Sequence, residues 1–121
     1  MDRIKLAKDF AKETLVEHQR IRDTKLRKSK VGDCKDYEYI VVWIQNELDQ
    51  DVSVTVKGNY DKTTLGGTTI ASAFTVSANS TKTYVVSVIG TNWLPYIWVE
   101  YGCSTAPTEG SLSIYLLKRN I

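Results

Sequence analysis

The sequence predicts a mainly β protein in which one long N-terminal amphipathic α-helix precedes an antiparallel β-sandwich of about six strands. Two observations predict this fold class. Residues 1–30 contain neither Gly nor Pro and carry apolar side chains at helical spacing, whereas the apolar period falls to two from residue 37 onward. The 121 residues suffice for one hydrophobic core. We therefore expect a basic helical arm over 1–32 and a jelly-roll-like sandwich domain over 33–121.

The expected helix begins near Asp2, a suitable N-cap, and ends at Gly32. Its apolar residues fall on one broad side, and most charged residues lie opposite. A helix of this length is marginal in water by itself, so the apolar side needs a surface to pack on, either the sandwich or a second copy of the chain. The expected packing or oligomer interface on this helix consists of Ile4, Ala7, Phe10, Ala11 and Leu15.

Most of the positive charge lies in this N-terminal segment. Residues 1–30 hold ten Lys or Arg and five Asp or Glu, a net charge of +5, whereas residues 31–121 hold six and nine, a net charge of −3. Such a segment complements the helix dipole as a solvated end, docks on an acidic protein, or neutralises nucleic-acid phosphates. Residues 11–36 contain no aromatic side chain to stack on bases, so we favour a protein partner over nucleic acid. The candidate anion-binding residues are Arg20, Arg22, Lys25, Arg27, Lys28 and Lys30.

The region after residue 36 is rich in β-branched and aromatic residues, with turn-forming residues between the runs. The expected strands are 37–46, 51–58, 69–76, 81–89, 95–103 and 111–118. Their short links favour antiparallel pairing, because parallel neighbours need long crossovers.

Two of these strands, 37–46 and 95–103, carry large apolar groups on both faces, so both faces need a cover. For the second strand, the N-terminal helix or a neighbouring subunit is the expected cover. Trp93, Tyr96 and Trp98 therefore form a further candidate interface or, alternatively, an aromatic platform that binds a sugar.

No group of residues in the sequence suggests catalysis or metal binding. His18 is the single histidine and lies among apolar residues of the expected helix, which indicates a packing role. Cys34 and Cys103 lack metal-site spacing; we expect two buried free thiols, with one Cys34–Cys103 disulfide as the alternative. We expect a protein that is not an enzyme and that uses no cofactor or metal.

No apolar run reaches the roughly 18 to 20 residues that cross a bilayer. The N-terminus also lacks the uninterrupted apolar core of a secretion signal. We expect a protein that is made in a cytoplasm and does not associate with membranes.

Two stretches, "IQNELDQDVSVTVKGN" and "LPYIWVEYGCSTAPTEGSLSIYLLKR", resemble small β-sandwich structural proteins of tailed bacterial or archaeal viruses, such as capsid-decoration, head-fibre or tail proteins. The shared features are a strand with Pro and aromatics at 95–99, a Pro-Thr-x-Gly link at 107–110 and a closing strand at 112–117. The basic N-terminal segment has no counterpart in that pattern. The resemblance implies a non-enzymatic virion protein, made in the host cytoplasm, that forms a homo-oligomer such as a trimer, or a lattice, with other virion proteins.

Overall fold

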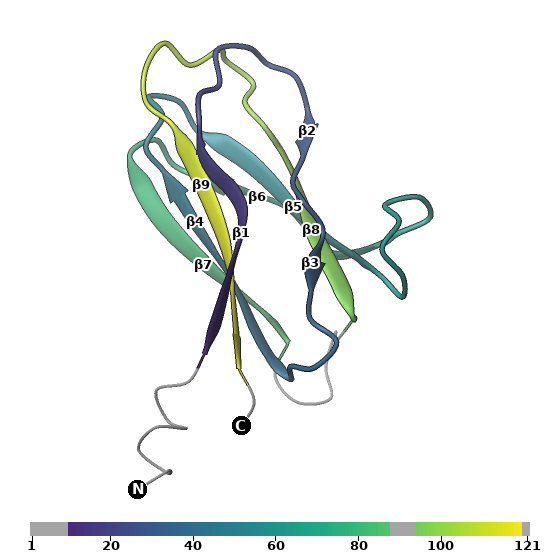
Figure 1. Cartoon of the computed structure of the whole chain (residues 1–121). Coiled ribbons are helices and arrows are strands. Elements are labelled where there is room, and N and C mark those ends of the chain that lie inside the picture. The colour runs from purple at the N-terminus through teal and green to yellow at the C-terminus, as the bar shows by residue number, and fades with distance from the viewer. Residues whose placement is uncertain (1–9, 88–93, 120–121) are drawn as a thin grey trace, which may run out of the picture.

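The computed structural model describes residues 10–87 and 94–119. Over these residues the chain is entirely β, with nine strands in two antiparallel sheets that face each other (Figure 1). The first sheet, here called sheet 1, has the order β1-β9-β4-β7. Its strands are β1 (Ala11–Gln19), β4 (Tyr39–Asn46), β7 (Ser80–Ser87) and β9 (Leu112–Arg119).

The second sheet, sheet 2, has the order β2-β8-β5-β6, with β3 also paired to β8. Its strands are β2 (Arg27–Lys28), β3 (Gly32–Asp33), β5 (Val52–Asn59), β6 (Thr68–Val76) and β8 (Tyr96–Gly102). Between β2 and β3, the backbone N–H of Ser29 donates to the carbonyl of Val99 at 2.8 Å, so residues 27–33 follow one edge of β8. Counted as one interrupted strand, β2 and β3 give two four-stranded sheets, the strand number of a jelly roll.

A single hydrophobic core lies between the sheets. Side chains alternate across a strand, so each strand supplies every second residue to it. Sheet 1 contributes Ile40, Val42, Ile44, Leu112, Ile114 and Leu116, and sheet 2 contributes Val52, Val54, Val56, Ile97, Val99 and Tyr101, all of them buried.

The predicted N-terminal helix is wrong for the described residues. Residues 11–19 form β1, which pairs with β9, and the predicted division at residue 32 falls in β3. The helix-like apolar spacing arises from two register shifts in β1, between Thr14 and Val16 and between Val16 and Gln19. A bulge adds a residue to one strand only, so strict alternation is lost, and the consecutive residues Leu15 and Val16 are both buried. The start of the predicted helix, residues 1–9, lies outside the described residues.

The six predicted strands correspond in order to β4 through β9. Every boundary that the structure describes lies within two residues of the predicted one. These strands were predictable because their alternation is regular and turn-forming residues separate them.

Candidate interaction surfaces

The outer face of sheet 1 carries a shallow apolar groove of about 400 Å³. Its main lining residues are Phe10, Tyr39, Val41, Trp43, Val85 and Leu117. Phe10 is 61% exposed, Val85 48% and Trp43 39%, which is unusual for side chains of this kind on one face of a small domain. Contiguous exposed apolar side chains commonly mark an interaction site.

Strand register explains how the groove forms. Because Ile40, Val42 and Ile44 face the core, the residues between them in β4 face outward. Val41 pairs with Val85 of β7 on one side and with Leu117 of β9 on the other. Directly paired residues share a face, so three apolar side chains form a row across three strands.

The next row has a similar character. Trp43 pairs with Thr83 on one side and with Tyr115 on the other. The centre of the groove floor therefore consists of residues of β4 and β9, whose backbones are paired on both sides, and Thr83 and Val85 of the edge strand β7 flank it.

The rim of the groove is cationic. Arg119 lines the groove, and its guanidinium lies 5.3 Å from the centroid of the Tyr39 ring. Outside the lining, the Lys12 ammonium lies 4.8 Å from the centroid of the Tyr115 ring. Such cation–π contacts hold long basic side chains against the aromatic faces. Among the described residues, the lining of the groove includes no Asp or Glu. The groove therefore suits an apolar group that carries neutral or negative charge at its edge.

The predicted aromatic interface on β8 is mostly covered by the same chain. Trp98 is fully buried on the face of sheet 2 that points away from the core. A Cβ on Gly67, in the connection between β5 and β6, would lie 2.3 Å from Cη2 of Trp98, so this connection packs directly on the indole. The cover predicted from the N-terminal helix is thus supplied by the β5–β6 connection. Tyr96 is half-buried, and Trp93 lies outside the described residues.

The other predicted interface residues are scattered. Phe10 lines the groove, Ala11 is half-buried in β1, and Leu15 belongs to the core. Ile4 and Ala7 lie outside the described residues. Trp43 and Val85 were not among the predicted interface residues, although the two apolar faces of strand 37–46 indicated a covered surface on the strand of Trp43.

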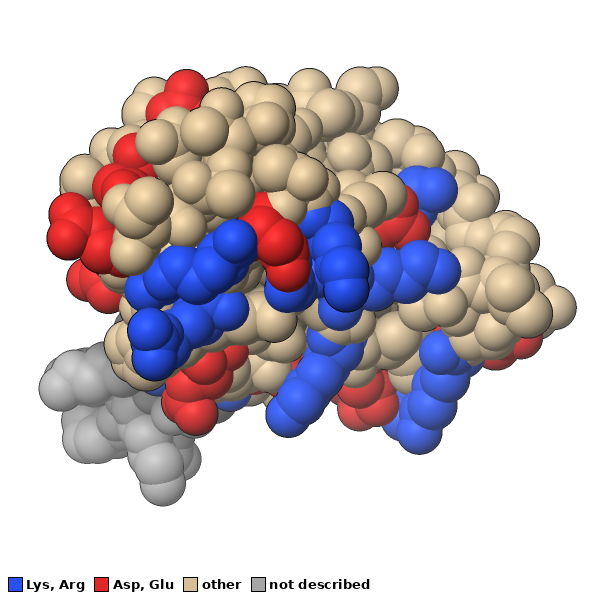
Figure 2. Space-filling model, turned by 90° about the horizontal axis from the view of Figure 1, so that it is seen from above, with Lys and Arg blue, Asp and Glu red and all other residues tan. Residues whose placement is uncertain are grey.

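The predicted anion-binding residues lie in β2 and in the segments around it. Arg22 donates to the carbonyls of Ile21 and Gly110, at 2.8 and 3.1 Å, and Arg27 forms an ion pair with Asp23 at 2.6 Å. The other predicted basic residues, Arg20, Lys25, Lys28 and Lys30, are exposed. Viewed from above, Lys and Arg side chains form a broad band with Asp and Glu side chains beside them (Figure 2). Binding of an anionic partner by these residues stays a prediction.

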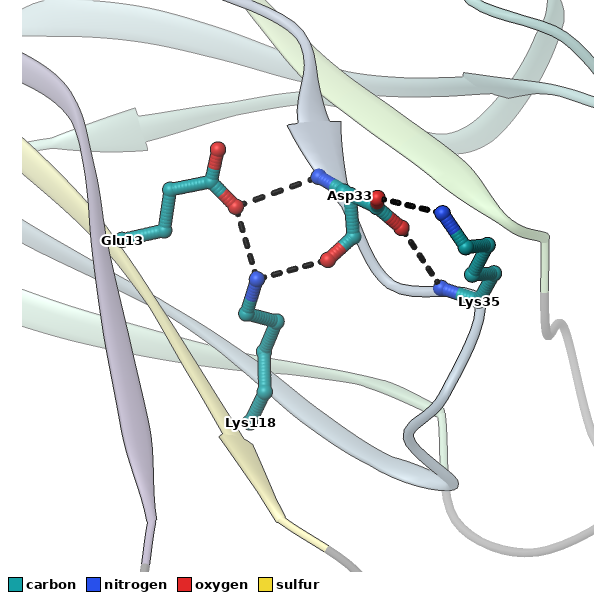
Figure 3. Close-up of polar contacts among 4 residues, drawn as sticks. All are labelled: Glu13, Asp33, Lys35 and Lys118. Carbon is teal, nitrogen blue, oxygen red and sulfur yellow. Dashed lines mark hydrogen bonds and ion pairs between the residues drawn. The ribbon is translucent and has the colours of Figure 1, made fainter.

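A polar cluster around the buried side chain of Lys118 joins the two sheets along one edge (Figure 3). The Lys118 ammonium of β9 donates to Glu13 Oε1 of β1 at 2.7 Å and to the Asp33 carbonyl of β3 at 2.6 Å. The same Glu13 oxygen accepts the backbone N–H of Asp33 at 3.1 Å. Lys118 is buried and lies 5.1 Å from the centroid of the Tyr37 ring. These contacts give the ammonium a counter-ion and a carbonyl acceptor, and they explain why a lysine is buried at this position.

The single histidine is part of the second bulge of β1, not of a helix. His18 is exposed and has a φ of 44°, and its backbone N–H donates to Ser113 Oγ at 3.0 Å. Its ring Nδ1 lies 3.4 Å from the same oxygen. Ser113 is buried, so this contact positions the bulge and does not present a hydroxyl to solvent.

Cys34 and Cys103 are both buried, and no disulfide joins them. The backbone N–H of Cys34 donates to Pro95, just before β8, whereas Cys103 follows the end of β8. A strand of that length spans roughly 20 Å, and a disulfide needs Cα atoms within about 7 Å. The alternative of a disulfide within one chain is therefore wrong. Burial raises the pKa of the Cys34 thiol to about 12.

The described residues hold no group of three or more His, Cys, Asp or Glu that could bind a metal ion. In the same part of the chain, no helix has the length and apolar character needed to span a membrane.

Comparison with known proteins shows a likeness in fold only. No protein-family model matches the chain, and no curated protein sequence matches it. The crystal structure of the PBSX exported protein XepA is similar with a TM-score of 0.67 and 14% identity, over 90% of this chain and 37% of XepA. The crystal structure of PirA has a TM-score of 0.49 with 10% identity, over 90% of this chain and 91% of PirA.

A structure of the infectious bursal disease virus Gx strain has a TM-score of 0.45 with 10% identity, over 92% of this chain and 32% of that one. The XepA likeness shows that nearly all of this chain adopts a sandwich fold that XepA also contains. The chain spans little more than a third of the length of XepA.

Proposed function

We propose that this chain is a non-enzymatic structural protein of a virus particle and that it assembles through the groove on sheet 1. The observation that carries the assembly role is the groove itself, an apolar surface with a cationic rim. The viral context is supported by the sequence resemblance to virion sandwich proteins and by the fold shared with XepA, which is named a PBSX exported protein.

The groove has the physical properties of an assembly surface. Its centre is apolar and its edge polar, as in protein interfaces in general. Val41 and Trp43 are held by β4, which pairs with a strand on each side, so little conformational entropy is lost when a partner binds. The sugar-binding alternative has less support, because Trp98 is fully buried and cannot stack on a sugar.

Particle association is the direct test of the proposal. Particles produced by a host that carries this gene are purified on a density gradient, and the copy number of the chain per particle is measured by quantitative mass spectrometry. We expect the chain to band with the particles at constant copy number. Trp43→Ser should reduce that number severalfold, whereas Ser53→Asp, on the outer face of sheet 2, should leave it unchanged. A chain that never bands with the particles would overturn the proposal.

A further inference from the structure

The connection between β5 and β6, residues 60–67, projects away from the sandwich and is here called the β5–β6 loop (Figure 1). It exposes two large apolar side chains: Tyr60 is 78% exposed and Leu65 is 79% exposed. Neither contributes to the hydrophobic core. Exposed apolar side chains of this size commonly mark a contact with another molecule.

The backbone of this loop is held in place from inside. Asn59 is buried, and its side-chain amide donates to the carbonyls of Thr63 and Leu65 at 3.0 and 3.1 Å. Its side-chain oxygen accepts the backbone N–H of Tyr60 at 2.8 Å. The Thr63 hydroxyl accepts the backbone N–H of Leu65 at 3.1 Å. The loop is therefore preorganised, and burying its apolar side chains in a partner costs little additional ordering.

The base of the loop is anchored as well. Gly67 packs on the buried ring of Trp98, so the loop cannot approach sheet 2 more closely without displacing that indole. This contact fixes where the C-terminal end of the loop lies on sheet 2.

The groove on sheet 1 complements the β5–β6 loop in shape and apolar surface. It is concave and apolar, and Arg119 at its edge is exposed, while no acidic residue is found among the described residues that line it. The loop is convex and exposes the apolar side chains of Tyr60 and Leu65, and its charged side chains are Asp61, next to Tyr60, and Lys62. The groove and the loop belong to different sheets, and the loop points away from sheet 1 (Figure 1). One copy cannot fill its own groove with its own loop.

We propose that the β5–β6 loop of one copy docks in the sheet 1 groove of a second copy, with Leu65 and Tyr60 against Val41, Val85 and Leu117 and with Asp61 near Arg119. This inference rests on the proposed function and specifies one partner of the assembly surface. Two different surfaces meet, so each added copy leaves one free loop and one free groove. Such heterologous contacts produce a ring if the rotation closes and a filament if it does not.

Two complementary variants test this arrangement by sedimentation velocity. Leu65→Ser together with Tyr60→Ser removes the loop contact but leaves the groove intact. Val85→Asp places a charge in the groove, at an exposed position, but leaves the loop intact. Lys62→Ser, an exposed change within the same loop, is the matched control. Circular dichroism and thermal unfolding confirm that each variant is folded.

We expect the unmodified chain and Lys62→Ser to form species larger than a dimer as concentration rises. Each interface variant alone should be monomeric, with a dissociation constant raised at least about tenfold. An equimolar mixture of the two should form a dimer and nothing larger, because only one intact loop and one intact groove remain to meet.

Three results would overturn the inference: a monomeric unmodified chain at its highest soluble concentration, normal assembly of either variant alone, or no dimer in the mixture. Self-association of a chain that never enters particles would instead contradict the proposed function. The two failures are therefore distinguishable.

Discussion

The ammonium of Lys118 lies in the interior between β1, β9 and β3, where a charge is stable only if its partners are in place. Its position follows from strand alternation: Leu112, Ile114 and Leu116 face the core, and Lys118 is the next residue on that face. Sequence periodicity therefore could have placed Lys118 inside. It could not have supplied the partners, because Glu13 is 105 residues away along the chain.

Glu13→Ala should lower the free energy of unfolding by about 2–3 kcal/mol, because it leaves the buried ammonium with one partner fewer. Urea denaturation followed by tryptophan fluorescence measures this change. Lys35→Ala removes an exposed ion pair with Asp33 and serves as the control, with an expected loss of at most about 1 kcal/mol. Equal losses in the two variants would contradict the assigned role of the buried cluster.

Asp23 gives a pH-dependent prediction. The hydrogen bond from Arg27 lowers the pKa of the Asp23 carboxyl from 3.8 to about 2. Because the folded-state pKa is depressed, the stabilisation from this contact is present above the unfolded-state pKa and is lost as pH falls toward 2. Carboxyl-carbon NMR should show a midpoint near 2, which Arg27→Ala should move back toward 3.8. An unchanged midpoint in Arg27→Ala would show that Arg27 does not form this contact in solution.

Among the elements, β1 shows what a local pattern cannot predict. Its residues include Ala, Lys, Glu and Leu, which favour helices, and its two bulges disrupt the alternation that marks a strand. The pairing partner β9 lies about a hundred residues later, so the interaction that decides the conformation is invisible locally. By contrast, β4 and β5 alternate without interruption on the core side, and their positions could be predicted.

The link between β8 and β9 depends on a glycine. Gly110 has a φ of +89°, and a Cβ there would lie 1.9 Å from the carbonyl oxygen of Glu47. We expect Gly110→Ala to lower the free energy of unfolding by about 2–4 kcal/mol, because it adds a backbone clash to an unfavourable φ. Gly66→Ala is the control, since Gly66 has a similar φ of +71° but open space around it, and should cost about 1 kcal/mol. Comparable losses in thermal or urea denaturation would contradict the steric explanation.

On the scale of the whole molecule, the sequence indicated that two strands needed a cover on both faces, but it did not indicate which cover each strand has. The outer face of β8 is closed by the β5–β6 loop, through Gly67 on Trp98. The outer face of β4 stays open as the groove. Which face is closed depends on where a connection far away in the sequence folds back, and alternation carries no information about that. From the sequence, the candidate site could therefore be predicted only as one of two strands with an apolar outer face.

Both thiols lie in the same hydrophobic core, so we expect them to report global unfolding. Burial raises the pKa of Cys34 to about 12 and also raises the pKa of Cys103, so the reactive thiolate is scarce in the folded protein. We expect negligible labelling by a thiol reagent in native buffer at pH 8. Labelling of both residues should increase together across the urea transition. Rapid labelling of either thiol without denaturant would indicate local opening around it.

The pairing of β1 with β9 places the first and last described strands side by side, with Ala11 opposite Lys118. Directly opposed residues in an antiparallel pair lie only about 5 Å apart. A linker of a few residues between positions 11 and 118 could therefore replace residues 1–10 and 119–121, and the cyclised chain could be reopened at an exposed turn with the remaining inter-strand pairings kept. The same proximity would let the sandwich be spliced, as a self-contained cassette, into a surface loop of another protein. The carrier would then be attached beside the groove, which Phe10 and Arg119 line, and the β5–β6 loop would stay available for neighbours.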